Sequence, residues 1–259
     1  MKKLMVASLM LMAAGAWAGT YSQNFDGYAD GTTVLGDGTQ VLDNGSGVTE
    51  VYNYSGSTSW SALRLTQDNV KGQIGNFVIG DLDAGDVVTG FTATFDTLIK
   101  ADSTPADGFS FNFGTLGSTP YGGEEGMYAG SGQMLSVCWD TYGPDIGIDI
   151  IVNGSTVSHS SVSPVVESSI DVAFRAVTIV WDESGLDVMY GGTSVFSDEV
   201  IGFSAGSGAE FAFAARTGDS FEDVFIDNLN ITTVPEPASV LLLGSISASM
   251  LFIRRRFML

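Results

Sequence analysis

Cysteine and histidine are almost absent from the 259-residue sequence, which contains only Cys138 and His159. A single cysteine cannot form an intramolecular disulfide, so a hydrophobic core, supplemented at most by a bound metal, must stabilise the fold. The single histidine lies in a polar run without a partner nearby in the sequence, which leaves little scope for a Ser-His-Asp triad. The composition therefore argues against both a disulfide-stabilised scaffold and a serine hydrolase.

Basic residues are also scarce, with 10 Lys and Arg against 30 Asp and Glu. Residues 19–233 contain 29 of the acidic residues and carry a net charge of −24, because they include only five basic residues, Arg64, Lys71, Lys100, Arg175 and Arg216. Neutralising phosphates requires lysine and arginine, so this region repels nucleic acid and anionic lipid. The charge excludes nucleic acid as a partner. It is typical of a secreted protein in a salty or cation-rich medium, or of one that gathers divalent ions.

Helical patterns are missing between residues 19 and 233, and short alternating runs take their place. Apolar residues recur at every second position, the period of a strand with one buried face. These runs centre on residues 91–97, 109–113, 135–139, 146–150, 177–181, 186–190, 211–213 and 224–226. Turn dipeptides such as Asn153-Gly154 and Gly191-Gly192 separate them. The pattern predicts an all-β protein, with one antiparallel β-sandwich over residues 19–233.

The first 18 residues, MKKLMVASLMLMAAGAWA, have the three parts of a secretory signal peptide. Lys2 and Lys3 form a basic segment and an apolar run follows. Ala16 and Ala18 then place small residues at the two positions that a signal peptidase inspects. The alternative, a buried N-terminal helix, fits this arrangement less well. We therefore predict that residues 1–18 are removed on export, and we exclude them from the fold.

A sixteen-residue apolar run at 238–253 is followed by Arg254, Arg255 and Arg256. As a helix rising about 1.5 Å per residue, it reaches only ~24 Å, against a hydrocarbon core of ~30 Å. It can cross a membrane only as a marginal span, by drawing in its flanks or thinning the bilayer. The positive-inside rule keeps the three arginines in the cytoplasm and places the residues before Val234 on the other side.

The end of the chain combines the sequence Val234-Pro235-Glu236-Pro237, the apolar run and the arginine cluster, in that order. Residues 234–259 resemble the PEP-CTERM sorting tail of Gram-negative bacteria, a family that pairs this tail with a signal peptide. The resemblance implies that Pro235, Glu236 and Pro237 are recognised by an exosortase, a membrane protease-transpeptidase. It implies export through the inner membrane, a transient C-terminal membrane anchor, and a final place in the cell envelope, on the cell surface or in the extracellular matrix.

Five short motifs follow one another along residues 61–231. They are SALRLT at 61–66, ADGFSFNF at 106–113, a Gly-rich stretch at 122–132, LSVCWDT with IGID at 135–149, and WDESGLDVMY at 181–190. In order and content they resemble the L-type, legume-lectin-like domains of the concanavalin A-like superfamily. The resemblance implies a concanavalin A-like jelly roll for the sandwich, and carbohydrate as its ligand.

The resemblance also implies where a sugar would bind. In that family the aspartate of the Ala-Asp-Gly segment accepts hydrogen bonds from two hydroxyls, a backbone N–H of the Gly-rich loop donates one, and an aromatic ring packs on the sugar. The matching residues are Asp107, Gly122, Gly123 and, as the ring, Tyr142, with Tyr121 and Tyr128 as further candidates. The alternative for Asp107 is an ordinary Asp-Gly turn residue, and for the tyrosines it is packing or solvent exposure.

The metal-binding strand of that family is altered in this sequence. The family offers Glu and Asp two residues apart to a Ca²⁺/Mn²⁺ pair, whereas this chain has Cys138 and Asp140. Asp145 matches either the family's second Asp or its His, and one residue cannot fill both places. Because Ca²⁺ takes about six to eight oxygen ligands, Asp140, Asp145 and backbone carbonyls offer at most a weak calcium site. The alternative is that no metal site remains and that Cys138 is a small buried residue beside Trp139.

The carboxylate pattern does not favour catalysis. Glycoside hydrolases of the same superfamily typically present Glu-x-Asp-x-Glu on one strand, and no such run occurs here. The acidic segment 81–86 lacks the spacing of a calcium-binding loop and predicts a solvated hairpin loop. The sequence thus predicts an exported, non-catalytic, lectin-like protein that binds carbohydrate, such as the exopolysaccharide of its own cell. The alternatives are a structural matrix or biofilm component without a sugar site and, with least support, a glycoside hydrolase-like enzyme.

Overall fold

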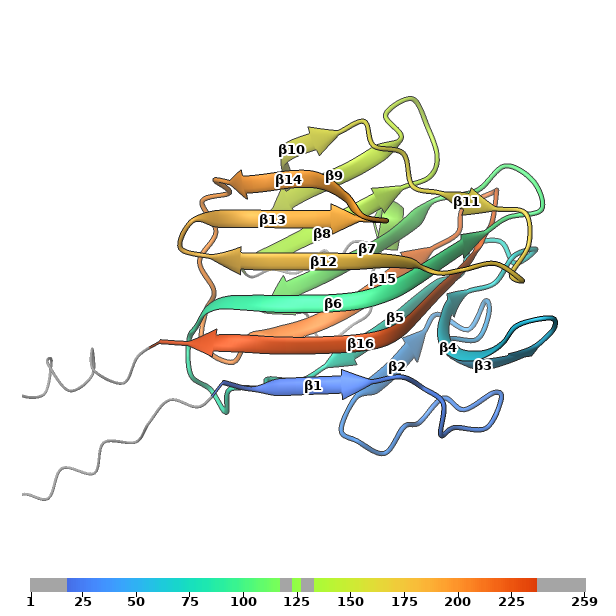
Figure 1. The fold of residues 1–259 in the computed structure, drawn as a ribbon, viewed down its shortest axis with the longest axis horizontal. Coiled ribbons are helices and arrows are strands. Elements are labelled where there is room, and N and C mark those ends of the chain that lie inside the picture. The colour runs from blue at the N-terminus through green and yellow to red at the C-terminus, as the bar shows by residue number, and fades with distance from the viewer. Residues whose placement is uncertain (1–17, 117–122, 127–132, 237–259) are drawn as a thin grey trace, which may run out of the picture.

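Two β-sheets packed face to face make up the protein in the computed structural model, which describes residues 18–116, 123–126 and 133–236 (Figure 1). Pairing within both sheets is antiparallel except for one two-residue strand. The prediction of an all-β sandwich is therefore confirmed.

The first sheet has nine strands. Seven lie side by side in the order β14 (Thr193–Glu199), β13 (Gly185–Tyr190), β12 (Arg175–Asp182), β6 (Val88–Lys100), β16 (Asp223–Pro235), β4 (Ser59–Thr66) and β3 (Glu50–Ser55). Two short strands complete it. β1 (Thr20–Gln23) pairs with the second half of β16, and β11 (Val166–Glu167) runs parallel to β6.

The second sheet has seven strands. Their order is β10 (Ser155–Ser160), β9 (Gly147–Val152), β8 (Met134–Asp140), β7 (Gly108–Gly114), β15 (Glu210–Arg216), β5 (Ile74–Ile79) and β2 (Gln40–Asp43). A 3₁₀ turn, η1 (Glu124–Gly126), is the one helical element of the described residues and contacts β7, β8 and β15. No helix within the described ranges could span a membrane, and the predicted span at 238–253 lies outside them.

Aromatic side chains fill the space between the sheets. Phe91 and Phe95 of β6 contact Phe111 of β7, with ring centroids 5.7 Å and 6.2 Å from that ring. Phe95 also meets Phe213 of β15 and Trp139 of β8 edge to face. All five side chains are buried. The alternating positions predicted to face inward therefore do form the core.

The register of the second sheet brings three strand ends together. Asp140, the last residue of β8, pairs with Gly108 at the start of β7 and with Gly147 at the start of β9. Gly108 has a φ of +112°, and a Cβ there would overlap the carbonyl oxygen of Trp139, so only glycine fits this close approach. Asp107 and the loop 141–146 consequently lie at the same edge of the sheet.

Three details differ from the sequence prediction. Ile146 precedes β9 and is 39 % exposed, because the strand begins only at Gly147. The loop 80–87 is not a hairpin loop, because it crosses from β5 in the second sheet to β6 in the first, and its Asp83 is buried and not solvated. β16 continues to Pro235, two residues into the predicted tail, since Pro235 is buried and pairs with Val88.

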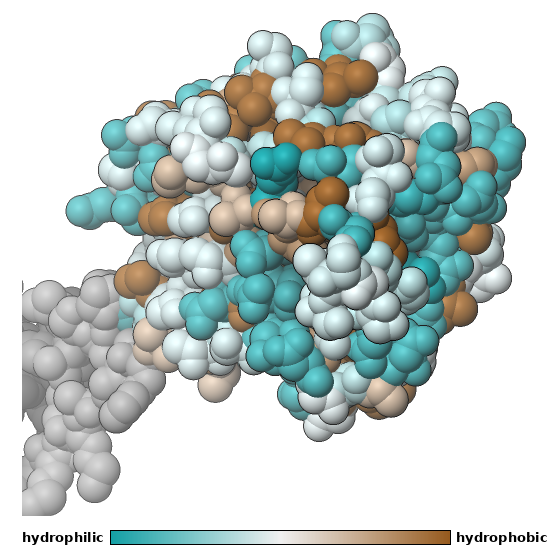
Figure 2. Space-filling view, turned by 45° about the vertical axis from the view of Figure 1, so that its right-hand side comes forward, coloured by the Kyte–Doolittle hydropathy of each residue, from teal (hydrophilic) through white to brown (hydrophobic). Residues whose placement is uncertain are grey.

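Figure 2 shows one face on which hydrophilic side chains surround scattered apolar areas. This distribution agrees with the large acidic surplus of the sequence.

Candidate functional site

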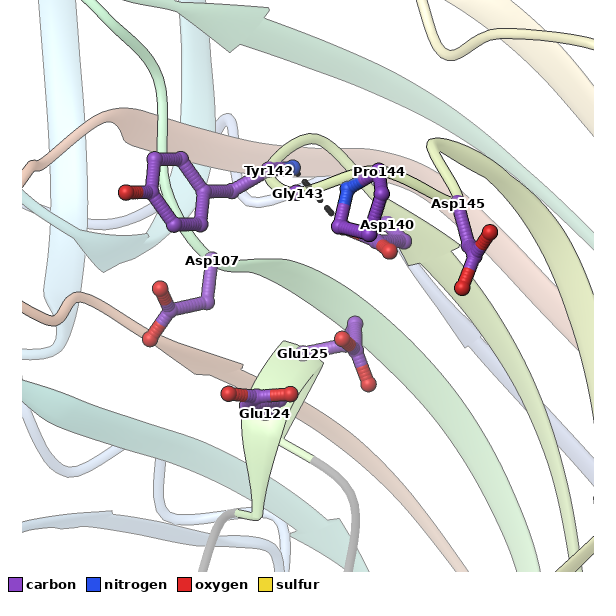
Figure 3. A pocket seen from close by; sticks show the side chains of 8 residues that line it. All are labelled: Asp107, Glu124, Glu125, Asp140, Tyr142, Gly143, Pro144 and Asp145. Atoms are coloured by element: carbon purple, nitrogen blue, oxygen red, sulfur yellow. Dashed lines mark hydrogen bonds between the residues drawn. The ribbon is translucent and has the colours of Figure 1, made fainter.

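A pocket of about 230 Å³ lies at the edge where β7, β8 and β9 meet (Figure 3). Its lining residues are Asp107, Glu124, Glu125, Asp140, Tyr142, Gly143, Pro144 and Asp145. Five of these eight are acidic and none is basic. The pocket therefore has a strongly negative potential and suits a ligand that offers hydroxyl or amine hydrogens, or a cation.

Asp107 lies just before β7, and its backbone N–H donates to the carbonyl oxygen of Arg216 at 2.9 Å. The peptide bond between Ala106 and Asp107 is cis. The Asp107 side chain is buried, and its Oδ2 lies 3.4 Å from Arg216 Nε but accepts no hydrogen bond from the described residues. Burial raises the pKa of Asp107 and Glu124 adds to the rise, while Arg216 opposes it. Oδ2 is closed off from solvent beside Arg216, so a ligand can reach this carboxylate only through the part of it that lines the pocket.

Asp140 and Tyr142 come from the end of β8 and the loop after it. The backbone N–H of Tyr142 donates to Asp140 Oδ1 at 2.7 Å, which fixes that carboxylate at the turn (Figure 3). Burial raises the pKa of Asp140, and neighbouring carboxylates add to the rise. The Tyr142 ring is 53 % exposed and stands beside Asp107 at the pocket rim (Figure 3). An exposed ring next to an acceptor can pack on the apolar face of a ligand whose hydroxyls reach the carboxylate.

Two glutamates of η1 line the pocket opposite Tyr142 (Figure 3). Glu124 is exposed and Glu125 is half-buried. Burial raises the pKa of Glu125 to about 8, and repulsion from Asp140 and Glu124 contributes. Near neutral pH this side chain holds its proton for much of the time and can donate as well as accept a hydrogen bond.

Beneath the pocket, Glu222 is fully buried in the segment that precedes β16. Its Oε2 accepts a hydrogen bond from the Thr141 hydroxyl at 2.9 Å, and its Oε1 has no partner among the described residues. Burial raises the pKa of Glu222 to about 8. Glu222 thus ties β16 to the loop that follows Asp140.

The donor set of the pocket matches calcium in chemical type, because it consists of hard carboxylate oxygens. However, the structure places no three His, Cys, Asp or Glu side chains close enough together to hold one ion in the described part of the chain. Asp140 and Asp145, the predicted metal ligands, both line the pocket without forming a metal site with a third residue. The residues as placed do not fit a preformed calcium site.

Cys138 is fully buried, as predicted, with its side chain on the face of β8 opposite to Trp139. It pairs across the sheet with Asp149 of β9, which in turn pairs with His159 of β10. His159 Nδ1 lies 3.0 Å from Asp149 Oδ1, so the histidine has a partner that the sequence did not reveal. Burial raises the pKa of Cys138, which leaves the thiol protonated and poorly suited as a ligand or nucleophile.

A second, shallower hollow of about 550 Å³ adjoins the pocket on the far side of Tyr142. Its lining includes Thr104, Pro105, Pro144 and the exposed Ile146, together with Tyr142 itself. The Tyr142 ring therefore separates an acidic pocket from a more apolar surface.

The structure brings together four of the predicted site residues, Asp107, Asp140, Tyr142 and Asp145. Gly123 immediately precedes η1, whereas Gly122, Tyr121 and Tyr128 lie outside the described residues. Of the sorting residues, Pro235 and Glu236 are described, while Pro237, Arg254, Arg255 and Arg256 are not. Of the predicted cleavage residues, Ala18 is described and exposed, and Ala16 lies outside the described part.

Sequence reasoning missed the roles of Glu125, Arg216 and Glu222 around this pocket. In the sequence, Glu125 was one residue of the Gly-rich stretch 122–132, and nothing indicated that it would line the pocket. Arg216 contacts Asp107, and Glu222 accepts a hydrogen bond from Thr141, although the two residues of each pair are far apart in the sequence. No local motif marks either contact.

Several solved structures with a similar fold are lectins. A lectin from Bauhinia forficata in complex with GalNAc is 16 % identical, covers 85 % of this chain and 99 % of its own, and has a TM-score of 0.55. The Emp47p carbohydrate recognition domain is 16 % identical over 82 % of this chain and 95 % of its own, with a TM-score of 0.57. The exoplasmic/lumenal domain of VIP36 in its Ca²⁺/Man₃GlcNAc-bound form is 13 % identical over 78 % and 86 %, with a TM-score of 0.50.

No family model matches the sequence, and no curated protein is similar to it at the sequence level. At these identities the structural similarity concerns the fold. The chain has the β-sandwich fold of legume-type and L-type lectins, and the resemblance in sequence motifs is confirmed at that level.

Proposed function

We propose that the protein is an exported, non-catalytic, lectin-like protein that binds carbohydrate in the pocket of Asp107 and Tyr142. One observation carries the proposal: the Asp107 carboxylate lines the pocket without accepting a hydrogen bond from the described residues, and an exposed aromatic ring stands beside it at the edge of a lectin-type sandwich. An exopolysaccharide of the producing cell is the expected ligand, in agreement with the predicted destination in the envelope or matrix.

In this proposal Asp107 accepts hydrogen bonds from two sugar hydroxyls, and Tyr142 packs on the apolar face of the ring. The backbone N–H is expected from Gly123, which precedes η1, or from Gly122, which lies outside the described residues. A second sugar unit can extend over Pro105 and Ile146, across the more apolar hollow. Negative charge around the pocket favours neutral or amino sugars over uronic acids, since acidic sugars would be repelled.

The proposed contacts of Asp107 and Tyr142 with a sugar involve no calcium ion, and within the described residues the carboxylates do not form a three-ligand site. A calcium ion that binds through Asp140, Asp145 and backbone carbonyls is the remaining proposal for a cofactor. Chelator sensitivity of sugar binding tests it directly.

The absence of catalysis is part of the proposal and is supported by the lectin neighbours. The sequence GFSAG at 202–206 has the spacing of a hydrolase nucleophile elbow. Its structural context differs from that elbow, because the next element is strand β15 and not a helix. Release of new reducing ends from a bound glycan would contradict the proposal that the protein is non-catalytic.

Export and processing belong to the same proposal and rest on the two ends of the sequence. Signal peptidase removes residues 1–18, and an exosortase acts at Pro235-Glu236-Pro237, so that the mature protein lacks Arg254, Arg255 and Arg256. Intact-mass measurement of the protein from its native host tests this, and an intact C-terminus at Leu259 would contradict it.

A structural matrix role is the second candidate, and the contact between Arg216 and Asp107 favours it. That contact already occupies part of the carboxylate which the sugar needs. The protein would then contribute an acidic surface to the envelope or biofilm and would bind no glycan.

A glycan array with and without chelator distinguishes these possibilities. We expect binding to neutral or amino-sugar glycans in the absence of chelator. Binding lost with chelator would assign a calcium ion to the site. The complete absence of glycan binding in both conditions would favour the matrix role and overturn the lectin proposal.

A further inference from the structure

Asp83, in the loop between β5 and β6, is a buried carboxylate that has no cationic partner among the residues which the structure describes. Its exposed fraction is 6 %, and its Oδ2 accepts no hydrogen bond from the described residues. Its Oδ1 accepts hydrogen bonds from the Thr233 hydroxyl at 2.7 Å and from the backbone N–H of Gly19 at 3.2 Å. An unpaired buried charge is costly, so this arrangement calls for a positive group.

The basic side chains of the sandwich are already engaged elsewhere. In the part of the chain that the structure describes, Arg64 pairs with Glu50, Lys71 with Asp219, Lys100 with Asp68 and Asp102, Arg175 with Glu167, and Arg216 with Asp107. None of these ion pairs includes Asp83. A further positive charge must therefore come from a group other than these side chains.

Gly19 is the residue that would become the amino terminus when the predicted signal peptide is cut after Ala18. Its nitrogen lies 2.8 Å from Thr233 Oγ1 and 3.2 Å from Asp83 Oδ1. As part of a peptide bond, this nitrogen carries one hydrogen for those two acceptors. As a free α-ammonium it would carry three hydrogens and a positive charge.

We propose that signal-peptide removal creates an ion pair between the Gly19 α-ammonium and Asp83, completed by the Thr233 hydroxyl; we name these three residues the amino-terminal clamp. In the cleavage, water adds across the bond between Ala18 and Gly19. The C–N bond breaks, the water oxygen bonds to the Ala18 carbonyl carbon, and the Gly19 nitrogen leaves as the ammonium. The ammonium can then donate to Thr233 Oγ1 and to Asp83 Oδ1, the two acceptors that already face the Gly19 nitrogen, and its charge pairs with the Asp83 carboxylate. The inference rests on the proposed export and is independent of sugar binding.

The requirement for glycine at position 19 is a separate observation that fits the clamp. A Cβ on this residue would overlap the carbonyl oxygen and the Cβ of Leu82. The loop 80–87 therefore closes directly over the new terminus, and it does so beside Ala18, which is exposed. Gly19 is thus held against this loop in the folded protein.

The clamp joins three parts of the chain that are distant in sequence. Gly19 leads into β1, which has only four residues and depends on β16 for pairing. Thr233 lies near the end of β16, and its N–H donates to the Gly19 carbonyl oxygen at 3.0 Å. Figure 1 shows that β1 begins and β16 ends at the same end of the sandwich. Processing of the N-terminus would therefore stabilise the strand that continues into the predicted sorting motif.

The first measurement locates the new terminus. The full chain is expressed in a Gram-negative host, and the N-terminal peptide is identified by mass spectrometry. We expect Gly19 as the first residue. A protein that retains residues 1–18 would defeat the export proposal as well, whereas cleavage at any other bond would overturn the clamp alone.

The second measurement isolates the ion pair. One serine inserted between Ala18 and Gly19 keeps the peptidase positions but returns the Gly19 nitrogen to a peptide bond. Asp83→Asn is then made in both backgrounds, with Asp86→Asn in the same loop as the exposed control. In the natural sequence Asp83→Asn should lower the melting temperature by at least about 5 °C, because it leaves a partly buried ammonium unpaired. In the serine-inserted protein it should leave the melting temperature unchanged or raise it.

An equal shift in the two backgrounds, or no shift in either, would overturn the clamp. Should Asp83→Asn prevent folding altogether, the reactivity of the terminal amine replaces the melting temperature. The Gly19 amine of the folded natural protein should react with an amine-directed acylating reagent at least about tenfold more slowly than the terminal serine of the inserted form. Equal rates would contradict the proposal.

Discussion

Asp227, on β16, is a carboxylate that folding removes from water without supplying a cation. Its exposed fraction is 9 %. Burial raises its pKa to about 6, and the carboxylates of Asp26 and Asp96 add to the rise. The N–H of Asn228, which donates to Asp227 Oδ1 at 2.7 Å, only partly opposes it. The folded protein therefore holds a proton at a pH where the unfolded chain has lost it.

The sign of the pH dependence follows from that difference. Below about pH 4 both states are protonated, and the contribution of Asp227 to stability is fully present. As the pH rises through about 6 the contribution is lost, because the folded state must then ionise a buried group. Asp227→Asn should remove this loss and raise the melting temperature at pH 8 by roughly 2 to 4 °C, with little change at pH 4.

Thermal melts of the wild type and Asp227→Asn between pH 4 and 8 check this prediction. Asp86→Asn, an exposed change of the same charge, serves as the control and should leave the pH profile in place. A melting temperature at pH 8 that is lower for Asp227→Asn than for the wild type would contradict the assignment.

At the scale of strands, the sequence was sufficient to predict where most elements lie. The alternation of Phe91, Ala93 and Phe95, and of Phe109, Phe111 and Phe113, reports a local geometry in which every second side chain meets the other sheet. Turn residues such as Asn153-Gly154 mark hairpins for an equally local reason, because Asn153 and Gly154 both have positive φ.

Non-local contacts could not be predicted in this way. Gly108 pairs with Asp140 and Ile226 with Leu63 only because the whole sandwich closes. Positions fixed by such contacts were missed or misplaced. Examples are the contact of Arg216 with Asp107, the burial of Asp83 and the extension of β16 to Pro235. Resemblance to a family assigned Asp107 and Tyr142 to a sugar site and Asp140 and Asp145 to a weak metal site, and the structure places all four in the lining of one pocket. No local pattern would have grouped them.

The core strands lead to a stability prediction. Phe111 of β7 is fully buried and contacts four other phenylalanines, Phe91, Phe95, Phe211 and Phe213, while Trp181 of β12 is 7 % exposed. Phe111→Ala and Trp181→Ala should each lower the free energy of unfolding by about 3–5 kcal/mol. Denaturant unfolding measures this loss, with Val157→Ala on the exposed strand β10 as the control. A loss below ~1 kcal/mol would mean that these rings do not form the core.

At the scale of the whole molecule, the pocket lies at one end of the sandwich, and the start of β1 and the end of β16 lie at the other (Figure 1). β6 runs from Val88, which pairs with Pro235, to Lys100, and the chain then passes directly to Asp107 at the pocket (Figure 1). A protein held to a membrane through its C-terminal segment would therefore present the pocket away from that membrane. This arrangement suits a surface lectin that meets polysaccharide on the outside of the cell.

The sugar pocket and the amino-terminal clamp differ in their exposure and in the source of their ligand. The pocket gathers five acidic side chains without a basic one in its lining and is open to a ligand. Asp83, at the other end, is closed off from solvent and is expected to gain its cation from the chain itself. Sugar binding and the amino-terminal clamp can therefore be tested independently, since neither shares a residue with the other.

Titration of the best glycan-array ligand into the wild type and into Asp107→Ala tests the central claim most directly. Hydrogen bonds to a charged group contribute roughly 1.5–3 kcal/mol each, so loss of the acceptor of two hydroxyls should weaken binding by at least about tenfold. Asp86→Ala, exposed and at the other end of the sandwich, should leave the affinity unchanged, and circular dichroism should show that Asp107→Ala keeps the fold. Glycan affinity that is the same in the wild type and in Asp107→Ala would contradict the pocket as the sugar site.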